Sequence, residues 1–185
     1  MSIMSESAFH RLYNDSYEEF KNNFPTDAMD EIDEQGNTLL MKALKLIIIF
    51  GQVADSVENK VDLNMTSMEI EHGPFDDDMK QMLVELPTII NDETLCDAEF
   101  QRLFKITALL IGATDNFNVV NKQGENALLL AMLMDRWLVK VWIGDINDYC
   151  DMIIFMIEKK MNRKPSARHV EGVLKRLNTD SSFNF

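Results

Sequence analysis

A glycine-centred turn followed by a leucine-rich helix occurs twice in this chain of 185 residues. DEQGNTLLMKAL spans residues 33–44, and NKQGENALLLAM spans residues 121–132. The two strings agree at Gln, Gly, Leu and Ala, and each begins with Asp or Asn. Their glycines, Gly36 and Gly124, are 88 residues apart. We therefore expect one local structure to be built twice.

Each position of the shared string has a physical role. The glycine can adopt a positive φ and turn the chain tightly before the helix. Three residues earlier, the side chain of Asp33 or Asn121 can close the turn by accepting main-chain hydrogen bonds. Two residues after the glycine, Thr38 or Asn126 is a good N-cap for the helix that follows. The sequence therefore predicts two capped helices, each preceded by a tight turn.

The pattern resembles the ankyrin repeat, N-x-x-D-x-x-G-x-T-P-L-H-x-A-A. The first copy matches it at Asp30, Asp33, Gly36, Thr38, Leu40 and Ala43, and the second at Asn118, Asn121, Gly124, Asn126, Leu128 and Ala131. LLIGATDNFN, upstream of the second copy, resembles the helix end LLxxGADxN of that family, and MIIFMIEKKMN downstream resembles the second helix of a repeat. The resemblance covers about half the chain and implies an array of antiparallel helix pairs.

The chain also departs from the repeat. Leu39 or Ala127 stands where the family has Pro, and Met41 or Leu129 stands where it has His, so the Thr–His hydrogen bond of the family is absent. A spacing of 88 residues is not a multiple of 33. Either an insertion of roughly residues 50–95 separates two repeats, or a degenerate repeat lies between them. The alternative fold is an irregular helical bundle.

Apolar periodicity and turn residues divide the rest of the chain into helices and breaks. Residues 7–24 predict one broken helix or two short ones, with Ser16 and Glu19 as a capping box. Further helices are expected over 39–53, 78–86 (ended by Pro87), from Thr94 or Asp97 to Leu110 (ended by Gly112), 127–137, 149–161 and 167–177. Residues 55–77 are expected to be an acidic loop or insertion, 139–148 a loop, and 178–185 a frayed tail. We expect a single all-α domain over residues 1–185.

Composition agrees with helices and with a cytoplasmic protein. For its length the chain contains few glycines (7) and few prolines (4) but many methionines (13), which favours helices. Cys96 and Cys150 are far apart and show no metal-ligand spacing, which favours two reduced thiols. No secretory signal precedes residue 20, and the longest apolar run, Leu46–Phe50, is far shorter than the roughly 20 residues that cross a bilayer. The alternative is export of the chain by a secretion system that reads other signals, which would place it in the cytoplasm of a host cell.

Charge is unevenly distributed. Residues 1–100 contain 22 acidic and 6 basic side chains, a net charge of −16, and residues 101–185 contain 9 and 12, a net charge of +3. Between Lys159 and Arg176, seven basic residues accompany one acidic residue, Glu171. Such a segment suits phosphate or an acidic partner. The net charge of −13 and the lack of interleaved aromatic residues argue against direct nucleic-acid binding.

No catalytic or cofactor motif is present. The sequence contains no HExxH, GxGxxG or GxxxxGK string. Cys150, His169 and Asp148 could form a nucleophile, base and orienting acid, but Cys150 lies in an apolar helical run that is more typical of a buried thiol. DINDYCD, from Asp145, begins like a calcium loop and lacks its glycine and closing Glu. We expect no cofactor, no metal and no enzymatic activity.

The resemblance implies a non-enzymatic module that binds another protein through its turn tips, as an adaptor or inhibitor. Small ankyrin-like proteins of viruses and intracellular bacteria act in this way on host proteins, so a role as an effector is an extension of the same reading. The residues expected to meet the partner are Glu34, Gln35, Asn37, Lys122, Gln123, Glu125, Trp137 and Trp142. Core packing is the ordinary role of the two tryptophans, and an exposed tryptophan would suit an interface anchor. The alternatives are an acidic decoy of a nucleic-acid-binding protein and a small cysteine-dependent enzyme.

Overall fold

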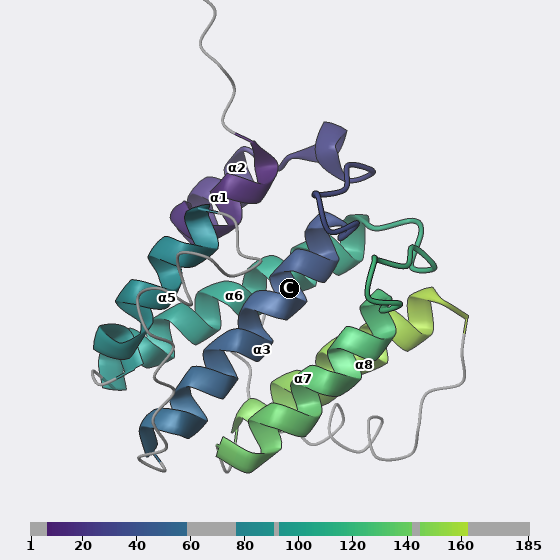
Figure 1. Cartoon of the computed structure of the whole chain (residues 1–185). Helices are drawn as coiled ribbons and strands as arrows, with labels where there is room; N and C mark the ends of the chain where they lie inside the picture. Colours follow the sequence, from purple (N-terminus) through teal and green to yellow (C-terminus); the bar gives the residue numbers. More distant parts are fainter. Residues whose placement is uncertain (1–6, 59–76, 91–92, 142–144, 163–185) are drawn as a thin grey trace, which may run out of the picture.

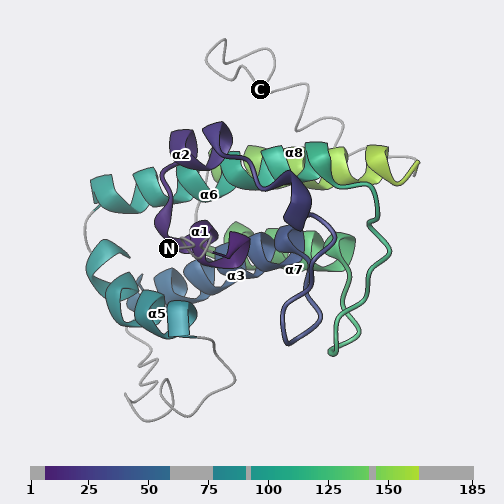
Figure 2. The ribbon, with the colours of Figure 1, turned by 90° about the horizontal axis from the view of Figure 1, so that it is seen from above.

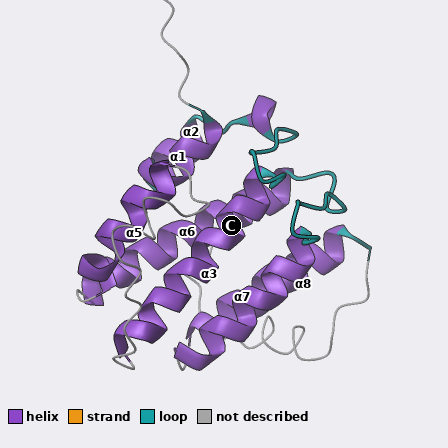
Figure 3. Ribbon diagram, viewed as in Figure 1, coloured by secondary structure: helices purple, strands orange, loops and turns teal. Residues whose placement is uncertain are grey.

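The computed structural model describes residues 7–58, 77–90, 93–141 and 145–162 (Figure 1). Within these ranges every regular element is a helix and no strand is formed (Figure 3). The predicted all-α class is therefore confirmed. The expectations for the tail 178–185 and for a helix over 167–177 fall outside the described residues, as does His169.

Two short helices open the described chain, which is one of the two arrangements that the sequence predicts for residues 7–24. They are α1 (Ala8–Asn14) and α2 (Tyr17–Asn22). Ser16 forms the expected capping box, because its hydroxyl accepts from the Glu19 amide and the Glu19 carboxylate accepts from the Ser16 amide. A single 3₁₀ turn, η1 (Thr26–Ala28), follows Pro25 and leads into the first glycine turn.

Helix α3 (Leu39–Glu58) is central to the fold. It packs against α7 (Ala127–Val141) on one side, and α1, α5 (Asp77–Ile90) and α6 (Glu93–Ala113) also contact it (Figures 1 and 2). Helix α8 (Asp145–Lys160) packs on α7 and α6. The chain is thus a stack of nearly aligned helices with α7 and α8 at one end.

Aromatic rings connect α3, α6 and α8 through the core. Phe50 meets Phe100 edge to face with ring centroids 4.5 Å apart, and Phe100 stacks on Phe104. Phe104 in turn lies 5.1 Å from Tyr149 between ring centroids. Arg102 joins this core to the first helices by donating to the carbonyls of Leu12 and Asp15. The N-terminal pair is therefore held against α6 and is part of the same body.

Several predicted helix boundaries are wrong. Helix α3 continues to Glu58, five residues past Val53, so residues 55–58 of the predicted loop are helical, while residues 59–76 lie outside the description. No proline or glycine follows Gly51 in this part of α3 to stop it. Helix α5 runs through Pro87 to Ile90. Proline removes one main-chain hydrogen bond, and the neighbouring bonds keep the last turn helical.

The starts and ends of the later helices also differ from prediction. Helix α6 begins at Glu93, so Thr94 and Asp97 lie in its first turns, where acidic groups favour the helix dipole. It passes Gly112, since one glycine costs a helix only about 1 kcal/mol. Helix α7 continues past Trp137 to Val141, and α8 begins at Asp145 rather than Tyr149. Residues 139–141 and 145–148 of the predicted loop are therefore helical, and residues 142–144 lie outside the description.

Candidate functional site

The two glycine turns, residues 33–38 and 121–126, adopt the same conformation. Gly36 has φ +82° and Gly124 has φ +79°, a region that side chains rarely occupy. In the first turn Asp33 Oδ1 accepts from the amides of Gln35 and Asn37, at 2.9 and 2.8 Å. In the second turn Asn121 Oδ1 accepts from the amides of Gln123 and Glu125, at 3.0 and 2.9 Å. The predicted turn closure by Asp33 and Asn121 is confirmed.

Both predicted N-caps are also present. Thr38 Oγ1 accepts from the Met41 amide at 3.3 Å, and Asn126 Oδ1 accepts from the Leu129 amide at 2.9 Å. Each bond satisfies a first-turn amide that has no acceptor within its own helix. Turn and helix therefore form one unit in each copy.

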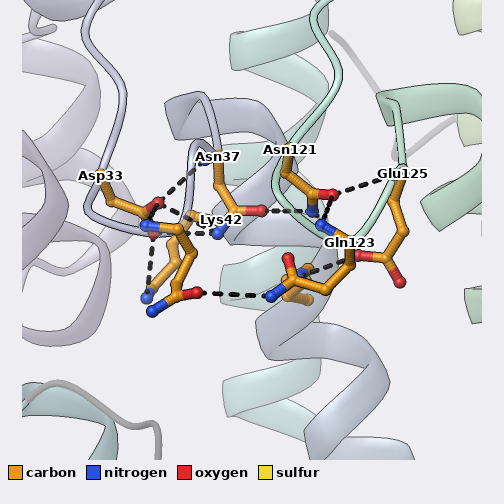
Figure 4. A network of polar contacts seen from close by, with 8 residues as sticks. Asp33, Asn37, Lys42, Asn121, Gln123 and Glu125 are labelled. Carbon is orange, nitrogen blue, oxygen red and sulfur yellow. Dashed lines mark hydrogen bonds and ion pairs between the residues drawn. The ribbon is translucent and has the colours of Figure 1, made fainter.

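The two turns lie edge to edge, which the sequence alone did not show (Figures 2 and 4). The Lys122 amide donates to the Gln35 carbonyl at 2.9 Å. Asn121 Nδ2 donates to Asn37 Oδ1 at 2.8 Å in a buried contact, and Gln123 Nε2 donates to Gln35 Oε1 at 3.3 Å. Both main-chain and side-chain hydrogen bonds thus join segments that are 88 residues apart.

Two lysines of α3 neutralise the carboxylates of the turns. Lys42 Nζ lies 3.4 Å from Asp33 Oδ2, and Lys45 Nζ lies 2.9 Å from Glu125 Oε2. Glu125 Oε2 also accepts from Asn121 Nδ2 at 2.8 Å. Sequence reasoning missed both lysines. The sequence does contain a signal for them. Two lysines stand in the first turns of a strongly apolar helix, and a partly buried ammonium group requires an acidic partner nearby.

The carboxylates of the network are held in their charged form. Burial raises the pKa of Asp33, but hydrogen bonds from Asn37 and Gln35 and the charge of Lys42 outweigh it, so the pKa is lowered. Burial likewise raises the pKa of Glu125, and the contacts with Asn121 and Lys45 more than offset it, so this pKa is lowered as well. Both groups therefore favour the folded state when they are ionised.

Acid should weaken the paired turns. Because both folded-state pKa values are lowered, the stabilisation is complete above the unfolded-state values, that is above about pH 5, and is lost as the pH falls through the folded-state values. We expect the urea midpoint to fall between about pH 5 and pH 3. The Asp33→Asn variant should show a shallower decline, since it lacks one of the two groups. An equal decline in that variant would contradict the role of Asp33.

The expected partner-binding residues fall into three groups. Glu34, Lys122 and Gln123 are exposed, and Gln35 and Glu125 are half-buried at the same edge. Asn37 is only 1% exposed, so its expected contact with a partner is wrong, because its side chain bonds Asp33 and Asn121 inside the molecule. Trp142 lies outside the described residues, and Trp137 lies in α7 with its side chain outside the description.

The structure places Cys150, the candidate nucleophile, in α8. Cys150 is fully buried, as its place in an apolar helical run predicts, and His169, the base of the alternative catalytic arrangement, lies outside the described residues. Among the described residues, no three His, Cys, Asp or Glu side chains are grouped as metal ligands would be. No described helix is both long enough and apolar enough to cross a membrane. Comparison with family models, curated proteins and solved structures finds no match.

Proposed function

We propose that the chain is a divergent ankyrin-like module that binds another protein through the tips of its paired turns and performs no chemistry of its own. The observation on which this depends is the edge-to-edge pairing of two identical glycine turns. Stacked turns that each begin a helix are the defining unit of such arrays. An adaptor or inhibitor, in the manner of an effector acting on a host protein, is the role that such a module suits.

The pairing favours an insertion over an intervening repeat. A degenerate repeat between the two copies would place its own turn between theirs, whereas Lys122 bonds directly to Gln35. On this reading α3 and α6 form the first helix pair, and α7 and α8 form the second. Helix α5 and residues 59–76 are then the inserted part.

The exposed residues Glu34 and Lys122 of the paired turns, together termed the tip, carry one negative and one positive charge. Glu34 and Lys122 are exposed, and no described residue forms an ion pair with either side chain. The main chain beneath them is fixed by the turn hydrogen bonds, so binding costs little ordering of the backbone. A rigid polar tip of this kind is suited to a complementary protein surface.

The tip is tested by capture of partners from extract of the cell in which the chain acts. We expect the Glu34→Ala/Lys122→Ala variant to lower the affinity for the captured protein at least 10-fold, since truncation of interface hot spots costs about 2 kcal/mol or more. Glu18→Ala/Lys21→Ala makes the same changes on exposed residues of α2 and should bind as the unaltered chain does.

Two results would contradict the proposal. One is equal capture by the two double variants. The other is a complex that dissociates as salt rises and is displaced by DNA, which would favour the acidic decoy.

A further inference from the structure

The face of α7 that points away from α3 carries two exposed apolar side chains, and none of the described helices packs over them. Leu138 of α7 faces α3 closely, because a Cβ atom on Gly51 would lie 2.6 Å from its Cδ2 atom. Leu129 precedes Leu138 by nine residues, or two and a half helical turns, and so points the opposite way. Leu129 is 42% exposed and Met132, one turn further on, is 53% exposed. Two large apolar side chains therefore lie exposed one helical turn apart on the same side of α7.

The equivalent positions of the first copy, on α3, are buried. The counterparts of Leu129 and Met132, 88 residues earlier, are Met41 and Leu44, which are 1% and 0% exposed. Leu44 precedes Gly51 by seven residues, about two helical turns, and so lies on the side of α3 that meets α7. The same strip is therefore buried between helices on α3, whereas on α7 it is exposed among the described residues.

The two turns differ in the same way as the two helices: a main-chain group of the first turn contacts the second turn, and its counterpart in the second turn has no such contact among the described residues. The Gln35 carbonyl accepts from the amide of Lys122 on the next turn. Its counterpart, the Gln123 carbonyl, accepts no hydrogen bond from any described residue. The second turn thus offers a carbonyl to which no described residue donates, on the edge where the first turn binds its neighbour.

Basic side chains flank this strip on α7. Lys122 lies at the turn and Arg136, one turn after Met132, lies further along α7, and both are exposed. The nearby acidic groups are less accessible, since Glu125 is paired with Lys45 and Asp135 is 9% exposed. A positive edge in a chain of net charge −13 favours an acidic partner.

A second copy of the chain fits this face poorly. Contact of two identical faces across a two-fold axis would bring basic side chains together in either orientation, because Lys122 and Arg136 lie at the two ends of the strip and would oppose each other or themselves. A head-to-tail contact would place α7 of one copy on the side of α3 that faces away from α7 in the next copy. Helices α1 and α5 already occupy that side of α3. The geometry therefore favours a different protein.

We propose that Gln123, Leu129, Met132 and Arg136, together termed the end face, bind an acidic amphipathic helix of a partner protein. The helix lies along α7, covers Leu129 and Met132 with apolar side chains, and places carboxylates beside Lys122 and Arg136. A main-chain amide at its start donates to the Gln123 carbonyl. The inference deepens the proposed function, because it names a second surface and a chemical class for the protein that is bound.

The test uses two fluorescein-labelled stapled helical peptides of about 18 residues, five helical turns. Both carry the same leucines at i, i+3 and i+7, and the flanking positions are Glu in one and Lys in the other. In fluorescence anisotropy with the full chain, we expect the Glu peptide to bind at least about 10-fold more tightly than the Lys peptide. Leu129→Glu/Met132→Glu should weaken its binding at least 10-fold. Val84→Glu replaces an apolar side chain that is 67% exposed on α5 and should bind the peptide as the unaltered chain does.

The inference is overturned if the Glu peptide does not bind, if the two peptides bind equally, or if the end-face variant binds the Glu peptide as the unaltered chain does. A photoreactive benzoylphenylalanine at position 132 should cross-link to the Glu peptide; a cross-link to a second copy or to residues 163–185 of the same chain would overturn it. The Glu34→Ala variant should keep full peptide binding, since Glu34 lies on the first turn. One combination of results separates the two proposals. If the Glu34→Ala/Lys122→Ala variant no longer captures the cellular partner and the unaltered chain does not bind the Glu peptide, the end face is rejected and the proposed function stands.

Discussion

Gly36→Ala should lower the free energy of unfolding by about 2–4 kcal/mol, and Gly124→Ala by about 1–2 kcal/mol. Both glycines have a positive φ, so alanine is strained at either position. At Gly36 the new methyl group would also lie 3.3 Å from the Cα atom of Asn121, a main-chain atom that cannot rotate away. At Gly124 no atom beyond the glycine and its two neighbours in the chain lies within 4 Å of the added group. The difference between the two losses therefore measures the closeness of the turns.

Chemical denaturation of the two variants measures this difference directly. Gly112→Ala is the control, because Gly112 lies in α6 with nothing within 4 Å of an added Cβ atom. Alanine favours a helix over glycine by up to about 1 kcal/mol, so this variant should be unchanged or slightly more stable. Equal losses at Gly36 and Gly124 would mean that the turns do not touch in solution.

Asn121→Ala should lower the free energy of unfolding by about 3–5 kcal/mol. The Asn121 side chain accepts from two amides of its own turn and donates to Asn37 Oδ1 and Glu125 Oε2. Its loss leaves buried polar groups of both turns without partners, and each costs about 1–3 kcal/mol. Thermal or urea unfolding would measure the change.

Asn121→Asp separates the bonds within the turn from those between the turns. The carboxylate can still accept from the amides of Gln123 and Glu125, as Asp33 does in the first copy. It cannot donate, and it faces Asn37 Oδ1 and the Glu125 carboxylate at hydrogen-bond distance. We expect this variant to lose about 2–3 kcal/mol near neutral pH. Stability equal to that of the unaltered chain would show that the contacts across the turns contribute nothing.

Local structure was predictable from the sequence where adjacent residues determine it. The positive φ of both glycines, the closure by Asp33 and Asn121, and the capping box of Ser16 all depend on side chains within four residues of the groups they bind. Helix periodicity likewise predicted the all-α class. Helix ends were less predictable, since Pro87 and Gly112 have the composition of breaks and are overridden by their neighbours.

The site itself depended on contacts that no local pattern encodes. Asn37 was expected to face a partner because it follows the glycine of a polar turn, yet its amide is used by Asp33 and Asn121. The pairing with Asn121 closes 84 residues of chain, so only the packing of α3 on α7 fixes it. The exposure of Leu129 and Met132 follows from the same packing, since their counterparts on α3 are buried.

Amide hydrogen exchange at Lys122 tests the paired turns most directly. The side chain of Lys122 is exposed, and its amide has one acceptor, the Gln35 carbonyl on the other turn. The Glu34 amide is its counterpart 88 residues earlier and has no acceptor among the described residues. Paired turns predict slow exchange at Lys122 and fast exchange at Glu34 by NMR. Equally fast exchange at both amides would contradict the edge-to-edge pairing on which the proposed scaffold depends.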